Sequence, residues 1–253
     1  SNLTIMRSLL APSLLNVVVD NLKKGNNDGR LFELSNIYIP KQQPITELPE
    51  ERLQLGFAAW GEGEDFFTMK GAVEALGTAF GTELTVVRAT DVPWLHPGIA
   101  AYILCEGERV GVFGKLANDV TAELKLPKDS RSNQNIYLGE IDWSKFYDLV
   151  PKALHYTPIP ELAPVQRDLA LVAPEETECG TLTAEMQRAC KQLTRVELFD
   201  IYRGEKLGAG KKSMAFSLYF QPGDKPFTPD EIDRFVKKIL GNLKFKLGIE
   251  IRE

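Results

Sequence analysis

The chain has 253 residues, 43% of them hydrophobic and 26% charged, which suits one large globular domain or two ordinary ones. Its longest apolar run is far shorter than the ~20 residues that span a membrane, so we expect no membrane contact. The net charge is −5, and residues 156–253 carry 15 basic and 15 acidic side chains. Bulk charge therefore does not indicate a nucleic-acid-binding protein, and any such binding must depend on local clusters.

Cysteine and histidine are few and scattered along the chain. The three cysteines form no C-x-x-C pair, and the two histidines are His96 and His155. We therefore predict no metal site, and a reduced, cytoplasmic protein without disulfide bonds. The chain begins with Ser1 and not with Met, so we interpret it as part of a longer polypeptide.

The first 150 residues predict an antiparallel sheet with flanking helices. Apolar residues at helical spacing indicate a helix over residues 3–22, with a start or a kink at Pro12. Asp65 precedes a second helix, which runs to Gly81. His96-Pro97-Gly98 predicts a turn. We expect strands at residues 30–39, 53–60, 84–89, 100–106, 109–114 and 135–141, and a short helix at 120–126.

Four prolines between residues 150 and 166 indicate a linker at 151–163, between a domain at 1–150 and another at 164–253. The second domain predicts the order βαββαβ, which is that of the ferredoxin-like fold. Its last strand is predicted from the alternation of Phe245, Leu247, Ile249 and Ile251. Such a fold packs both helices on one face of the sheet and leaves the other open, and the whole chain is of the α+β class.

Two strands of the second domain, residues 198–205 and 211–220, can form a binding surface on that open face. If Phe199 and Ile201 supply the apolar side of the first strand, Asp200 and Tyr202 lie beside Ser213 of the second. An ordinary hairpin with a solvated polar face is the alternative reading, and the pattern alone favours it.

The loop between these strands is basic. The cations that bracket it are Arg203, Lys206, Lys211 and Lys212. Cations at the rim and an aromatic ring on the sheet suit single-stranded RNA, because the cations engage phosphates and the ring stacks on a base. A solvated charged loop fits this pattern about equally well.

Four segments of the second domain resemble the ferredoxin-fold anticodon-binding domain of the bacterial phenylalanyl-tRNA synthetase β subunit. They occur in the expected order at residues 164–172, 198–205, 210–216 and 227–232. Residues 5–15, 31–34, 65–71 and 96–100 of the first domain resemble the synthetase-like core of the same subunit. The resemblance covers essentially the whole chain and is to the C-terminal portion of that subunit.

This resemblance implies a core that is built like a class II synthetase catalytic domain but does not catalyse. Class II enzymes hold the ATP phosphates with an Arg on one motif strand and with a Gly-rich motif that ends in Arg. The sequence agrees with a non-catalytic core, because Glu33 lacks the adjacent Arg and no such Gly-rich segment follows residues 135–141. The fragment itself is thus expected to hold no catalytic residue and no cofactor. The intact enzyme would use ATP and Mg²⁺ at a catalytic α subunit, in an α2β2 assembly, to join phenylalanine to tRNA(Phe).

Matched residue by residue, the resemblance implies anticodon contacts at Asp200, Tyr202, Ser213 and Arg252. Tyr202 would stack on a base, Asp200 and Ser213 would bond base edges or ribose, and Arg252 would contact phosphate or base. No DNA partner is expected. Two alternatives stay open, which are an interaction scaffold that binds no RNA and a stand-alone ATP-dependent ligase.

Overall fold

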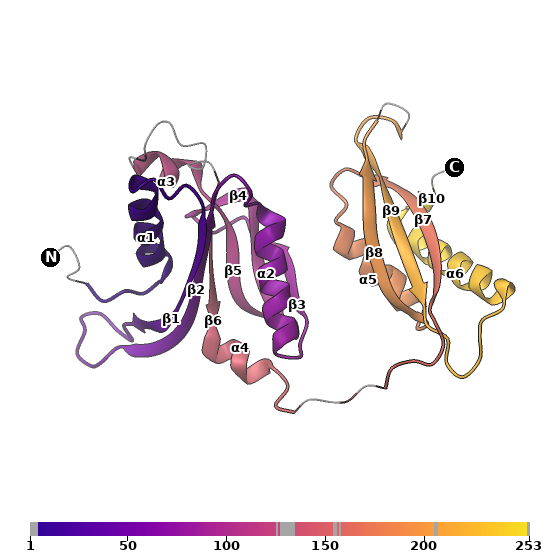
Figure 1. Ribbon diagram of the computed structural model, residues 1–253, viewed down its shortest axis with the longest axis horizontal. Coiled ribbons are helices and arrows are strands. Elements are labelled where there is room, and N and C mark those ends of the chain that lie inside the picture. The colour runs from indigo at the N-terminus through magenta and orange to yellow at the C-terminus, as the bar shows by residue number, and fades with distance from the viewer. Residues whose placement is uncertain are drawn as a thin grey trace. The chain divides into compact units, whose positions relative to one another are not determined.

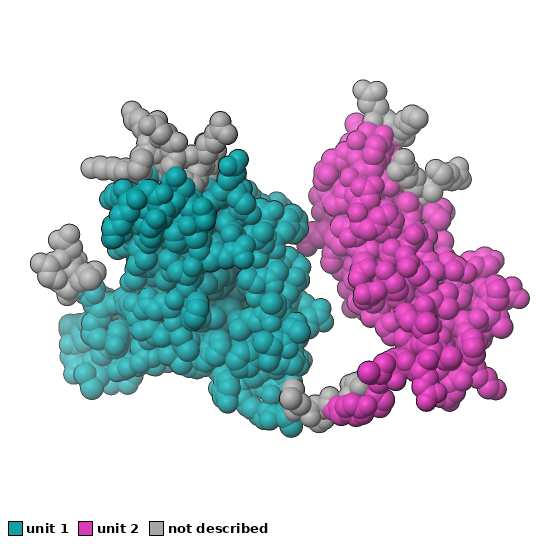
Figure 2. Space-filling model, viewed as in Figure 1, with its two compact units in different colours: residues 1–155 teal, residues 156–253 magenta. Residues whose placement is uncertain are grey.

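The computed structural model of the chain describes residues 5–124, 126, 135–153, 156, 158–204 and 207–251. The chain divides into two compact units, residues 1–155 and 156–253 (Figure 2). The division falls within residues 151–163, where prolines are frequent. None of the described helices is long and apolar enough to cross a bilayer.

The first unit is built on a six-stranded antiparallel sheet with the order β1-β2-β6-β5-β4-β3 (Figure 1). Its strands are β1 (Gly29–Ile39), β2 (Glu50–Trp60), β3 (Leu84–Arg88), β4 (Leu95–Cys105), β5 (Glu108–Leu116) and β6 (Ile136–Asp142). Its helices are α1 (Ala11–Lys23), α2 (Phe66–Ala79), α3 (Asn118–Glu123) and α4 (Trp143–Leu149). The predicted antiparallel sheet with flanking helices is confirmed.

The two faces of this sheet support separate apolar clusters. Ala58 packs with α1, whereas the next residue, Ala59, packs with α2 and α4. Ile136 and Tyr137 of β6 divide in the same way. This follows from the two-residue period of a strand, which sends neighbouring side chains to opposite faces. Helices therefore cover both faces of the sheet.

Helix α1 confirms the predicted alternative of a start near Pro12, and not a helix that runs from residue 3. It starts at Ala11 with Pro12 in its first turn, where a missing N–H costs nothing. Its N-cap residue offers no side-chain hydrogen bond, and the carboxylate of buried Glu140 on β6 instead accepts the N–H of Ala11. The preceding segment runs beside β1, where the Arg7 carbonyl accepts the N–H of Tyr38 at 2.8 Å.

The first unit differs from the prediction at two further places. His96-Pro97-Gly98 does not form a turn between elements but lies near the start of β4, next to a register shift between Leu95 and Ala100. Helix α4 directly follows β6 and was not predicted. Its seven residues are too few to give a clear helical period in the sequence.

The second unit has the element order βαββαβ, as predicted. Its elements are β7 (Val165–Pro174), α5 (Cys179–Ala189), β8 (Leu193–Tyr202), β9 (Lys211–Phe220), α6 (Pro229–Leu247) and β10 (Glu250–Ile251). The four strands are antiparallel in the order β10-β7-β9-β8 (Figure 1). Leu182 of α5 and Ile239 of α6 share one core with Phe216 and Leu218 of β9, so both helices pack on the same sheet face.

The predicted last strand is wrong over residues 245–249. Phe245 and Leu247 belong to α6, which ends at Gly248 in the left-handed conformation with φ of 65°. Glycine adopts this conformation without steric cost, so it terminates the helix. Of the predicted last strand, Glu250 and Ile251 alone pair with β7, with Glu250 opposite Val172.

Phe199 does not line the apolar face, contrary to prediction. The pairing of β8 with β9 shifts register between Leu198 and Asp200, and Leu198 packs against the core instead. Such a bulge adds one residue to the strand and reverses the parity on one side of it. Phe199 is consequently 59% exposed, and Ile201 lies opposite the core residue Met214 but is itself 40% exposed.

Candidate nucleic-acid interface

The pairing of three strands brings the predicted contact residues together on the open face of the second unit. Tyr202 of β8 lies opposite Ser213 of β9, which lies opposite Val172 of β7. The neighbouring row consists of Asp200, Ala215 and Ala170. Directly opposed residues share a sheet face with Cβ atoms ~4.5–5.5 Å apart. Asp200, Tyr202 and Ser213 therefore form one group at one end of this face.

Tyr202 is the exposed aromatic residue of this group, at 38% exposure. Its ring lies against Gly204, where an added Cβ would overlap the phenol oxygen and ring carbons. Exposed Phe199 lies nearby on the same strand, beside Asp200. The exposure of Phe199 was not predictable, because the bulge that exposes it leaves no recognisable pattern in the sequence.

Ser213 lies on the predicted face but not at its surface. It is 2% exposed, and it lies between Tyr202 and Val172 in the sheet. Within the described residues we find no hydrogen-bond partner for its hydroxyl, although buried polar groups are normally paired. Direct contact with a ligand would require the side chains around Ser213 to move and expose its hydroxyl.

The basic cluster at the rim is partly engaged with Glu175, which follows β7. Arg203 donates to Glu175 Oε1 from Nε at 2.9 Å and from Nη2 at 2.8 Å. This hydrogen bonding lowers the pKa of the Glu175 carboxyl. Lys212 Nζ donates to the Glu175 carbonyl at 2.7 Å, and Lys211 is exposed. Lys206 and Arg252 lie outside the described residues.

A polar network that was not predicted from the sequence lies farther along the open face. Asp168 of β7 lies opposite Ser217 of β9. The Ser217 hydroxyl donates to Asp168 Oδ1 at 2.7 Å, and Gln166 Nε2 donates to the same oxygen at 3.0 Å. These hydrogen bonds, chiefly that from Gln166, lower the pKa of the Asp168 carboxyl. The carboxylate is therefore charged at neutral pH and held in a defined position.

The last row of the open face carries an aromatic side chain that is already covered. Arg195 places its guanidinium 3.9 Å from the ring centre of Tyr219. The Tyr219 hydroxyl donates to Glu197 at 3.0 Å, and Arg195 pairs with Glu197 at the same distance. The Tyr219 ring and hydroxyl are thus already engaged within the chain.

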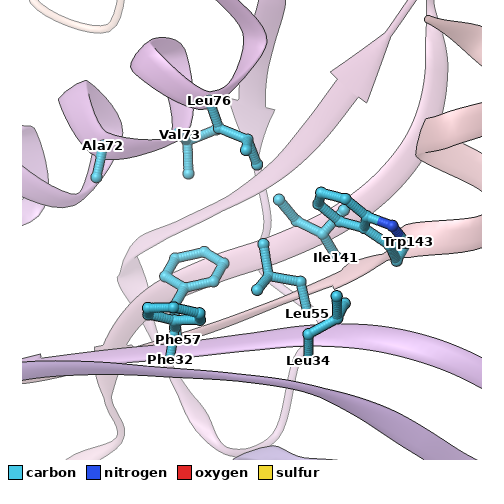
Figure 3. A pocket seen from close by; sticks show the side chains of 9 residues that line it. All are labelled: Phe32, Leu34, Leu55, Phe57, Ala72, Val73, Leu76, Ile141 and Trp143. Atoms are coloured by element: carbon cyan, nitrogen blue, oxygen red, sulfur yellow. The ribbon is translucent and has the colours of Figure 1, made fainter. Parts of the chain in front are cut away.

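The first unit has an apolar hollow between α2 and the sheet (Figure 3). It measures about 340 Å³, and one wall is Ala72, Val73 and Leu76 of α2. The facing side chains come from β1, β2, the end of β6 and α4; they are Phe32, Leu34, Leu55, Phe57, Ile141 and Trp143. Phe32 on edge strand β1 is 76% exposed. Exposed apolar surfaces of this kind indicate binding of a partner.

Glu33, for which the sequence offered no partner, forms an ion pair with Arg7 at 2.8 Å. Arg7 also donates from Nε to the carbonyl of Asn36 at 3.2 Å. This arrangement ties the segment before α1 to the edge strand. It gives Glu33 a structural explanation without any ligand.

Two family models account for nearly all of the chain. Residues 1–143 match the phenylalanyl tRNA synthetase beta chain CLM domain, and residues 160–252 match the ferredoxin-fold anticodon binding domain. The chain belongs to the phenylalanyl-tRNA synthetase beta chain family. The resemblance inferred from the sequence motifs is thereby confirmed, as is the α+β fold with a ferredoxin-like second part.

Phenylalanine–tRNA ligase beta subunits of bacteria are similar over 98% of this chain. That of Lactococcus lactis is 33% identical and that of Carboxydothermus hydrogenoformans 30% identical. The matched regions are 31% and 32% of those proteins, so the chain spans about a third of their length. A pyrrolysyl-tRNA synthetase structure from Desulfitobacterium hafniense has a TM-score of 0.44 at 14% identity, covering 59% of this chain and 55% of that one. That similarity is too low to support an inference.

Proposed function

We propose that this chain is the portion of a phenylalanine–tRNA ligase β subunit that supports the catalytic α subunit and binds the anticodon region of tRNA(Phe). Residues 1–150 would be the non-catalytic synthetase-like core, 151–163 a linker and 164–253 the anticodon-binding domain. The observation that supports this most directly is the exposed ring of Tyr202 beside Asp200, on the sheet face opposite the two helices.

The open face can hold an unpaired base in the way single-stranded RNA is usually held. Tyr202 stacks on the base, which contributes ~1–3 kcal/mol for contacts of this kind. Asp200 accepts a hydrogen bond from the base edge or the ribose. Ser213 takes part only if binding uncovers its hydroxyl, since this side chain is buried in the free chain.

Cations at the rim would bind the phosphates that flank the stacked base. Lys211 is exposed and suited to this task, and Arg203 and Lys212 contribute once phosphate competes with Glu175. We extend the same role to Lys206 from its place in the basic loop of the sequence, and to Arg252 from the family resemblance. Binding would then weaken as salt rises, because it releases counterions.

The chemistry of the intact enzyme would take place on the α subunit, with ATP and Mg²⁺ bound there and in an α2β2 assembly in the cytoplasm. The first unit would support that subunit through exposed apolar surface, of which the hollow at Phe32 is an example. Glu33 would contribute no catalytic carboxylate, because its charge is already paired with Arg7.

The proposal is tested by titrating the chain with an RNA stem-loop that has the tRNA(Phe) anticodon arm sequence. We expect saturable binding that weakens with salt and is reduced by Tyr202→Ala. A chain that binds no RNA at any salt concentration would favour the interaction scaffold. Binding of ATP by the isolated chain would favour the stand-alone ligase.

A further inference from the structure

Asp168 is an oriented hydrogen-bond acceptor on the same sheet face as Tyr202. Gln166 and Ser217 both donate to Oδ1. Within the described residues no donor reaches Oδ2, so this oxygen keeps its capacity to accept. The exposed carboxylate is charged, because the two hydrogen bonds lower its pKa. It therefore offers a ligand one fixed anionic acceptor.

A fixed anion on an RNA-binding surface selects the part of the RNA that approaches it. Phosphate groups are repelled, so the backbone must pass elsewhere, along the rim with Lys211 and Arg203. Base edges with N–H donors are attracted, and carboxylates pair in this way with exocyclic amino groups. Asp168 can thus contact RNA favourably through a base.

The space between Asp168 and Tyr202 suits a flat ring. The row between them on the two inner strands consists of Ala170 and Ala215, whose side chains are single methyl groups. Successive rows on one face are two residues apart, or about 7 Å along the strand. A base lying over this row would have Asp168 at one edge and the row of Tyr202 and Ser213 at the other.

The buried hydroxyl of Ser213 is a second, independent indication of a ligand at this place. It adjoins the alanine row, is 2% exposed, and has no hydrogen-bond partner that we find among the described residues. Buried hydroxyls normally have one. A polar atom of a base that rests on Ala215 would supply the missing partner once binding uncovers the hydroxyl.

We propose that Asp168 recognises the exocyclic amino group of a second nucleobase, an adenine or a cytosine, next to the base that stacks on Tyr202. Gln166 and Ser217 are the residues that position its carboxylate. Hypoxanthine and uracil are rejected, because each places a carbonyl oxygen where adenine or cytosine has the amino group. The inference rests on the proposed anticodon-binding function and adds base selectivity to it.

The test is an NMR titration of the ¹⁵N-labelled 253-residue chain, which also measures weak binding. The probes are the tRNA(Phe) anticodon stem-loop and copies of it in which one loop adenosine becomes inosine or one loop cytidine becomes uridine. We expect one such replacement to weaken binding to the unaltered chain by about tenfold. In Asp168→Asn the loss should disappear, because Gln166 and Ser217 would hold the amide oxygen and leave the NH2 group, a donor, facing the base.

A matched control is Glu197→Gln, which removes a carboxylate opposite Ser217 from the same row. This variant should keep the full preference for the amino base. If Asp168→Asn and Asp168→Ala both keep that preference, Asp168 does not read the base and the inference is overturned. Should Tyr202→Ala still weaken binding in that case, the anticodon-binding function stands. If no RNA shifts any resonance, both proposals fail.

Discussion

Gly204 lies so close to the ring of Tyr202 that a single added methyl group would overlap the phenol oxygen. The glycine lies two residues after Tyr202, the last residue of β8, and its lack of a side chain leaves room for the ring at the end of the open face. The orientation of the proposed stacking residue therefore depends on a neighbour that makes no contact with RNA itself.

Gly204→Ala should displace the Tyr202 ring and weaken binding of the anticodon stem-loop by about tenfold, while the chain stays folded. The physical reason is loss of part of the ~1–3 kcal/mol that base stacking contributes. Gly241→Ala is the matched control, because Gly241 lies within α6 and has open space at its Cβ position. Binding isotherms and thermal unfolding of both variants check this. Equal affinities for the two would contradict the role of Gly204.

Lys211→Ala should weaken RNA binding to a similar extent for every loop sequence. It should also reduce the slope of log K against log salt by about 0.7, the value for one lost phosphate contact in a single strand. Lys237→Ala serves as the control, because Lys237 is an exposed cation on α6, which packs on the other face of the sheet. An unchanged slope for Lys211→Ala would exclude its contact with phosphate.

Glu140 makes the stability of the first unit depend on pH. Burial raises its pKa above the ordinary glutamate value, even though the hydrogen bonds from the amides before and at the start of α1 act against this. The folded state therefore binds the proton more tightly than the unfolded state does. The resulting contribution to stability is fully present below the unfolded pKa and is lost as pH rises through the folded pKa.

Glu140→Gln keeps an oxygen that can accept the Ala11 N–H but carries no charge. The free energy of unfolding of the unaltered chain should consequently fall, relative to this variant, as pH rises from about 4 to about 8. Urea unfolding of both proteins over this range measures the difference. A difference that does not vary with pH, or that moves the other way, would show that Glu140 has an ordinary pKa.

Phe32→Ser should weaken assembly with the α subunit by about tenfold, as expected for loss of an aromatic residue at the centre of an interface. The substitution should cost the chain little stability, because Phe32 is mostly exposed. Phe245→Ser is the control, since Phe245 is equally apolar, also exposed and in the second unit. Co-purification with the α subunit compares the two, and equal retention would exclude the Phe32 hollow as the contact.

Much of the fold was predictable because strand and helix periods are local. The alternation in residues 211–220 is enough to identify β9, and Thr228 and Glu231, which form a capping box, mark the start of α6 in the sequence. The end of α6 was not predictable, since Phe245 and Leu247 satisfy a strand period and Leu243 and Leu247 a helical one. The helix continues through Leu247 and ends there, because Gly248 adopts the left-handed conformation that terminates a helix.

The candidate site was predictable only in part. The two-residue period of a strand correctly placed Asp200 and Tyr202 on the same open face. The assumption that Phe199 faces the core was wrong. A bulge depends on the pairing with β9 and has no local pattern. Arg7–Glu33 and Asp168–Ser217 join residues 26 and 49 positions apart, so only tertiary structure reveals them.

The most direct test of the proposed function is Tyr202→Ala in the full-length β subunit, assembled with its α subunit and assayed for charging of tRNA(Phe). If Tyr202 stacks on an anticodon base, KM for tRNA should rise about tenfold or more. KM for phenylalanine and for ATP should stay unchanged, because their sites would lie on the α subunit. An unchanged KM for tRNA would contradict the account of the open face as the anticodon-binding surface.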